Sequence, residues 1–182
     1  MQVLQLNTPL TTLEDAIGKA KSWYSSFEGE LMPTMLSYTK SECMLVALPS
    51  LGDRENGGRE HSIEFAKMFN TIFDIHIYCL LMESYVLKQE SKEADMSKWV
   101  GRLKDHPDAV EKLTIVVCSG DKNVLVSYDI TKDRQLINEE KFDGVGGDFV
   151  EMGAMKNIPS EAKSYLRARF MQDFKMSPGP KA

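Results

Sequence analysis

The most apolar stretch of the chain runs from Phe73 to Lys88, and it constrains the fold more than any other segment. It is rich in Ile, Tyr and Val, which favour strands because branched and aromatic side chains pack well on a pleated sheet. Both alternating sets of side chains are apolar, as in a strand that is covered on both faces. The stretch therefore predicts a central strand. One long helix through Ile75–Gln89 is the alternative, because no Pro or Gly interrupts it.

Helices are predicted where apolar residues recur at spacings of three and four. Thr12–Asp15 has the form of a capping box, in which the hydroxyl accepts a hydrogen bond from an amide of the first turn. An apolar stripe from Leu13 to Phe27 follows it and predicts the first helix. Ser62 is expected to cap a second helix that leads into the central strand. A third helix is expected from Ser160, docked on the sheet through four side chains at steps of four: Ala162, Leu166, Phe170 and Phe174.

Extended runs surround the central strand on both sides in the sequence. Pro33–Thr39 and Cys43–Leu48 are separated by a short polar link, which indicates a hairpin. Leu113–Cys118 and Val124–Ile130 flank a turn that contains Ser-Gly-Asp, so they predict a second hairpin. Gln135–Asn138 is short and charged, and we expect it at an edge of the sheet.

These elements predict an α+β fold built on one mostly antiparallel sheet. The expected order is α-β-β-α-β-β-β-α, with about three helices packed on five or six strands, the sixth being the short edge strand. A chain of 182 residues has the usual size of one domain. Residues 1–176 are therefore expected to form a single domain, and the Pro- and Gly-rich segment 177–182 a disordered tail.

Composition excludes several classes of partner. The chain has 22 Lys and Arg against 27 Asp and Glu, a net charge of −5, and no basic run that would hold a polyanion. No apolar run approaches the roughly 20 residues that a membrane-spanning helix needs. The N-terminus lacks the basic and long apolar regions of a signal peptide. We therefore expect a cytoplasmic protein that binds neither nucleic acid nor membrane.

The three cysteines, Cys43, Cys79 and Cys118, lie far apart, each in an apolar run that predicts a strand. An odd number without a Cys-x-x-Cys pair argues against a disulfide framework and against a structural zinc site. They are predicted to be buried free thiols in a reducing compartment.

Asp74 and His76 are the candidate metal ligands. They are two residues apart, so on a strand both side chains would project to the same face, as a metal pair or an acid-oriented general base requires. An Asp at the junction of helix and strand, beside a half-buried His, explains the same residues without a functional site. Both interpretations are open from the sequence.

Glu83 and His106 are the candidate catalytic residues. Glu83 lies among apolar neighbours, where loss of hydration disfavours the charged form of a carboxyl group and tunes it for acid–base chemistry. His106 precedes the next strand and would approach the end of the strand that carries Glu83. In the structural alternative, Glu83 is hydrogen-bonded to backbone or to Arg102, and His106 belongs to a capped turn before Pro107.

The specific signatures of several enzyme classes are missing from the chain. It contains no Gly-x-Ser-x-Gly, no His-Glu-x-x-His and no P-loop motif, which mark many hydrolases, zinc proteases and nucleotide-binding enzymes.

Three segments carry a resemblance to small uncharacterised proteins of marine bacteria and their phages: Met82–Val86, Asp105–Ile115 and Tyr128–Asp133. The chain resembles these proteins over roughly residues 30 to 135, with Tyr85 after a Glu-Ser pair and a His-Pro-Asp turn before the next strand. The resemblance implies no known activity. It does imply that Glu83, His106 and Asp108 form one linked feature, whether structural or functional.

The expected function is a non-catalytic one, in which the protein binds or assembles through protein contacts. The expected assembly is a homodimer that forms through an exposed sheet edge or a Met-rich surface. The alternative is a small metal-assisted hydrolase that uses Glu83 and His106. Neither the cofactor nor the identity of a partner follows from the sequence.

Overall fold

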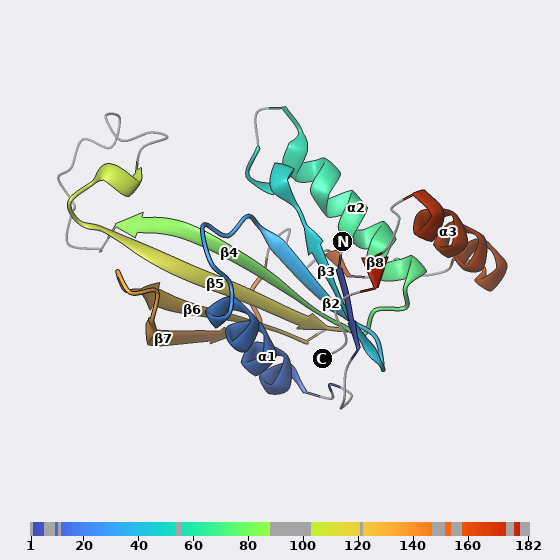
Figure 1. Ribbon diagram of the computed structural model, residues 1–182, viewed down its shortest axis with the longest axis horizontal. Coiled ribbons are helices and arrows are strands. Elements are labelled where there is room, and N and C mark those ends of the chain that lie inside the picture. Colours follow the sequence, from blue (N-terminus) through green and yellow to red (C-terminus); the bar gives the residue numbers. More distant parts are fainter. Residues whose placement is uncertain are drawn as a thin grey trace.

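A computed structural model of the chain describes residues 2–5, 10, 12–53, 56–87, 103–120, 122–146, 152–153, 158–173 and 177–178. An eight-stranded sheet, in the order β7-β6-β5-β4-β2-β3-β1-β8, crosses the molecule (Figure 1). The strands are β1 (Gln2–Gln5), β2 (Thr34–Tyr38), β3 (Glu42–Ala47), β4 (Ile77–Leu87), β5 (Ala109–Ser119), β6 (Lys122–Ile130), β7 (Leu136–Asp143) and β8 (Ser177–Pro178). Neighbouring strands are antiparallel except β1 and β8.

The α+β fold with a mostly antiparallel sheet is thus confirmed. The helices are α1 (Leu13–Ser25), α2 (Gly58–Ile72) and α3 (Ser160–Asp173), with short 3-10 turns at Pro49–Gly52 and Leu103–Asp105. The predicted edge strand is present as β7. The strands β1 and β8 extend the sheet beyond β3, and β8 falls in the segment predicted to be a tail. No helix in the described part of the chain is long and apolar enough to cross a membrane.

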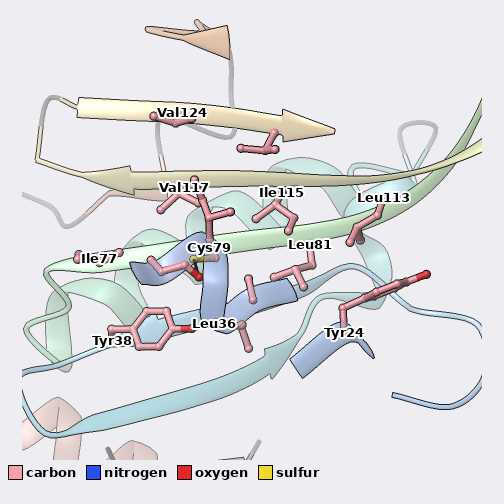
Figure 2. Packing of buried hydrophobic residues seen from close by; sticks show 14 of the residues in the cluster. Tyr24, Leu36, Tyr38, Ile77, Cys79, Leu81, Leu113, Ile115, Val117 and Val124 are labelled. Carbon is pink, nitrogen blue, oxygen red and sulfur yellow. Dashed lines mark hydrogen bonds between the residues drawn. The ribbon is translucent and has the colours of Figure 1, made fainter. Parts of the chain in front are cut away.

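The alternating side chains of β4 enter two different cores. Ile77, Cys79 and Leu81 pack beneath α1, and Figure 2 shows them beside residues of the neighbouring strands on that face. Tyr78 and Leu80 belong to the core beneath α2 on the opposite face. The prediction of a central, doubly covered strand is therefore confirmed, and the alternative of one long helix is wrong. Full burial of each large apolar side chain contributes about 1.5–3 kcal/mol to stability.

The predicted N-cap residue is correct for α1 but not for α2. At α1, the Thr12 hydroxyl accepts a hydrogen bond from the Asp15 amide at 3.0 Å and donates to the Asp15 carboxylate at 2.8 Å, so this capping prediction is confirmed. At α2, the prediction that Ser62 is the cap is wrong. Gly57 takes that place with a φ of 72°, and Ser62 lies inside the helix with its hydroxyl on the Gly58 carbonyl. Only glycine adopts this left-handed conformation readily, so the chain turns into the helix five residues earlier.

The prediction that α3 docks on the sheet through four side chains is wrong. It packs on α2 instead, where the ring of Phe170 lies 5.5–6.1 Å from three aromatic rings: Phe65, Phe69 and Phe73. Ala162 and Leu166 are exposed, and Phe174 lies outside the described residues. Steps of four residues advance by about 40° each around a helix of 3.6 residues per turn, so these side chains do not share one narrow face.

The three cysteines lie in the sheet, one each in β3, β4 and β5, and all are buried and free. The prediction that they are buried free thiols is confirmed. Burial raises the pKa of the Cys43 thiol to about 12, and it also raises the pKa of the Cys79 and Cys118 thiols. The apolar surroundings therefore keep the thiols protonated and unreactive.

Candidate functional site

Glu83 lies where β4 extends beyond its neighbour β2. The pairing of β2 with β4 ends at Leu81, whereas β5 accompanies β4 as far as Leu87. Glu83 follows Leu81 by two residues and faces the same side, toward α1. Its side chain is only 6% exposed. The Glu83 side chain is therefore buried, as its apolar neighbours in the sequence predicted.

Three donors surround the Glu83 carboxylate. Its Oε1 accepts hydrogen bonds from the Tyr24 hydroxyl at 2.7 Å and from Arg134 Nη2 at 2.6 Å. Its Oε2 accepts one from the Leu31 amide at 2.9 Å. Arg134 Nη2 also donates to the Tyr24 hydroxyl at 2.9 Å, which closes a triangle of polar groups. A buried carboxylate is stable when it is paired and hydrogen-bonded in this way.

The turn between β6 and β7 presents Arg134 to this site. Arg134 has a φ of 58°, and its amide donates to the Thr131 carbonyl at 2.8 Å. A residue other than glycine in this left-handed conformation costs about 1–2 kcal/mol. The guanidinium group lies 5.2 Å from the centre of the Tyr24 ring, in addition to its two hydrogen bonds. These contacts offset the cost of the turn.

The surroundings of the triangle are acidic. Burial and the neighbouring Glu83 carboxylate raise the pKa of Tyr24, so its hydroxyl stays a donor at physiological pH. Burial and the charge of Glu83 raise the pKa of Glu111. Tyr85 also has a raised pKa, through burial first and then through nearby carboxylates that begin with Glu111. Arg134 thus balances a group of carboxylates at this end of the sheet.

The structure does not place His106 among the donors and acceptors that contact Glu83. His106 is buried beside the 3-10 turn before β5, and its Nδ1 accepts a hydrogen bond from the Asp108 amide at 3.0 Å. This is the geometry of the capped turn that the sequence offered as the structural alternative. A catalytic role for the two residues stays a prediction, and both oxygens of Glu83 already accept hydrogen bonds.

The prediction that Asp74 and His76 share one face of a strand is wrong, because β4 begins only at Ile77. Asp74 has a φ of 52° in the link after α2, and its carboxylate pairs with Lys163 at 2.8 Å. His76 Nε2 lies 3.1 Å from the Leu10 carbonyl oxygen. The two side chains therefore have separate partners. The described residues include no group of three or more His, Cys, Asp or Glu side chains placed to hold a metal ion.

Sequence reasoning missed Tyr24 and Arg134 as partners of Glu83. Tyr24 stood in the apolar stripe of the first helix, although a buried tyrosine hydroxyl usually needs a hydrogen-bond partner and so points to a polar neighbour. Arg134 comes from a turn 51 residues away, and no local pattern connects it with Glu83. Arg102, the partner suggested by the sequence, lies outside the described residues.

A second polar surface lies between the end of α2 and the start of α3. It borders a cavity of about 260 Å³ whose walls include Asp74, Ser160, Lys163 and Arg167. Lys163 is paired with Asp74, and the Arg167 guanidinium lies 5.2 Å from the centre of the Phe73 ring. These cations therefore serve the packing of α3 on α2.

Comparisons of the chain with family models, with curated proteins and with solved structures give no match. The function is therefore inferred from the arrangement of the side chains alone.

Proposed function

We propose that the protein is a non-catalytic binding or assembly protein that acts through protein contacts. The observation that carries this proposal is the surface of α3. Tyr165 is 71% exposed, Met171 41% and Leu166 37%. Most large apolar side chains of a helix normally face a core, because their burial is what stabilises a short helix in water. These three side chains point in different directions around the helix, and contact with another protein would bury the most exposed of them, Tyr165.

The attachment of α3 supports the same proposal. Phe170 is the one buried side chain among residues 160–172 of the helix, and it holds α3 against the aromatic rings of α2. Figure 1 shows α3 on the outside of the molecule, beyond α2. A helix in this position presents its outer side to a partner without any change in the rest of the fold.

The buried carboxylate supports a structural role at the other candidate site. A metal ion or a substrate at Glu83 would have to displace the Tyr24 hydroxyl, the Leu31 amide or the Arg134 guanidinium, each within 2.9 Å of a carboxylate oxygen. Loss of these partners would leave buried polar groups without hydrogen bonds, at a cost of about 1–3 kcal/mol each. The alternative, a metal-assisted hydrolase with Glu83 and His106, therefore has less support.

Site-specific photo-crosslinking tests the proposal. A photoreactive phenylalanine analogue replaces Tyr165 in one variant and the exposed residue Lys19 on α1 in a control variant. We expect irradiation in cells that naturally encode the chain to give a discrete protein adduct from position 165 and none from position 19. Equal adducts at both positions, or none from position 165, would contradict a contact through α3.

A further inference from the structure

β7 forms a free edge of the sheet, visible as the brown strand at the lower left of Figure 1. The amide of Gly144 donates to the Asn123 carbonyl directly opposite at 3.0 Å. Hydrogen-bonded pairs alternate along an antiparallel ladder, so Phe142 also directs its backbone groups toward β6. Glu140 likewise faces β6, whereas Lys141 directs its amide and carbonyl outward. The trans peptide that carries the inward Glu140 amide turns the Glu139 carbonyl outward as well. No strand in the described part of the chain pairs with these outward groups.

The side chains of these two outward residues have opposite charges on the same face of the sheet. Lys21 of α1 lies 3.6 Å from Glu139, and Glu14 of α1 lies 3.1 Å from Lys141. Both edge residues are also open to solvent, with side chains 53% and 39% exposed. The edge thus carries an acid and a base two residues apart, each beside an opposite charge on α1.

We propose that β7 pairs antiparallel with β7 of a second copy of this chain. The inference rests on the proposed role in assembly, and it uses a surface separate from α3. A two-fold axis through Glu140 places Glu139 opposite Lys141 of the second copy, and by symmetry Lys141 opposite Glu139. In each of these pairs the outward Lys141 amide of one copy donates to the outward Glu139 carbonyl of the other. The two sheets become one continuous sheet with α1 of both copies on the same face.

The charges select this register over its neighbours. A two-fold axis through Glu139 would place two acids opposite each other, and an axis through Lys141 would place two bases opposite each other, which is destabilising. In the proposed register Glu140 meets Glu140 of the second copy on the other face. Each of these carboxylates pairs within its own chain with Lys112 Nζ at 2.8 Å, an ammonium group that also lies 3.3 Å from Asp129, and accepts a hydrogen bond from the Ser127 hydroxyl at 3.1 Å.

The remaining features of β7 agree with a short intermolecular ladder. Asn138 has a φ of 52° and lies with Glu139 at an irregularity in the β6–β7 register, so the regular part of the edge is limited to Glu140–Asp143. Ile137 is 44% exposed and Phe142 51%, and both lie close to the proposed contact. Charges on an edge strand usually prevent pairing with another chain. Here the two charges are complementary across the axis, so they favour pairing with an identical edge.

Charge reversal gives a test that separates recognition from folding. The dimer contains two symmetric contacts between positions 139 and 141. Glu139→Lys makes both of them Lys–Lys contacts, and Lys141→Glu makes both of them Glu–Glu contacts. An equimolar mixture of the two variants restores both opposite-charge pairs in a heterodimer. Glu28→Lys and Lys40→Glu are the matched controls, because they make the same charge changes at exposed positions away from β7. Sedimentation equilibrium measures the masses, and circular dichroism checks that each variant is folded.

We expect the wild type and both controls to form dimers of twice the 20.6 kDa chain mass. Each single β7 variant should self-associate about tenfold more weakly or worse, and the mixture should regain the wild-type affinity. Lys141→Pro should also prevent the dimer, because it removes an outward amide and leaves the hydrogen bonds to β6 in place.

A wild type that stays monomeric at millimolar concentration would overturn the proposal, as would a mixture that fails to regain the dimer. A dimer that ignores every β7 variant would remove this edge from the assembly and leave self-association itself intact. The crosslinking test at Tyr165 addresses the contact through α3 independently, so failure of one proposal is distinguishable from failure of the other.

Discussion

Glu83→Gln keeps the shape of a buried side chain and removes the charge that three donors share. One carboxylate oxygen becomes an amide nitrogen, so at least one of Tyr24, Leu31 and Arg134 would face a donor where it now has an acceptor. The substitution should therefore lower the free energy of unfolding with little change in the volume of the core.

The size of this loss in the free energy of unfolding depends on how exposed Glu83 and Arg134 are. Removing one partner of a buried ion pair lowers the free energy of unfolding by about 3–5 kcal/mol. The Arg134 side chain is 35% exposed, so water can solvate part of its charge after the substitution. We therefore expect a loss of about 2–3 kcal/mol. For a chain of this size each kcal/mol lowers Tm by about 2–4 °C, which predicts a fall in Tm of about 4–12 °C.

Urea denaturation followed by circular dichroism measures the free energy of unfolding, and a thermal melt gives Tm. Tyr24→Phe and the double variant complete a mutant cycle, in which we expect a coupling energy of about 1 kcal/mol or more, because Tyr24 and Glu83 share one hydrogen bond and one guanidinium. Glu64→Gln is the control. Its carboxylate is 63% exposed beside Lys67, so the change should stay within about 0.5 kcal/mol.

A Glu83→Gln variant as stable as the Glu64→Gln control would refute the structural role of the triangle. Additive effects in the cycle would show that Tyr24 and Glu83 stabilise the fold separately.

Three further predictions concern groups inside the core. Cys43, Cys79 and Cys118 should resist a water-soluble thiol reagent in the native protein and all react in denaturant, and rapid native labelling would contradict their burial. The Cys43 pKa is raised from 9.0 to about 12, so the folded state keeps a proton that the unfolded state releases between these values. Stability should therefore fall by about 1.4 kcal/mol per pH unit above pH 9 through this group, and Cys43→Ala should show a shallower pH dependence in urea titrations. Asn70→Ala should cost about 1–3 kcal/mol, because the buried Met152 carbonyl loses a donor now at 2.7 Å; a change below about 0.5 kcal/mol in the same assay would show that the contact is dispensable.

Local patterns were sufficient wherever a structure depends on residues close together in the chain. The Thr12 capping box, the hairpins and the doubly covered β4 strand all appear as the sequence predicted. Periodicity and capping act over a few residues, so the sequence shows them directly. The burial of Glu83 followed from the alternation of side chains along the same strand, β4. The start of α2 did not, because a left-handed glycine replaced the expected cap.

The partners of the polar groups depended on contacts between distant segments. Tyr24, Leu31 and Arg134 reach Glu83 from 59, 52 and 51 residues away, and Lys163 reaches Asp74 from 89 residues away. No periodicity spans such separations, because they are set by which strands become neighbours in the sheet and which helix covers each face. The sequence therefore contained the fold class and the buried carboxyl group. The packing of α1 and the turn before β7 determined that this carboxyl group is held by three donors, and the position of β7 at the edge determined which surface is open to a second copy.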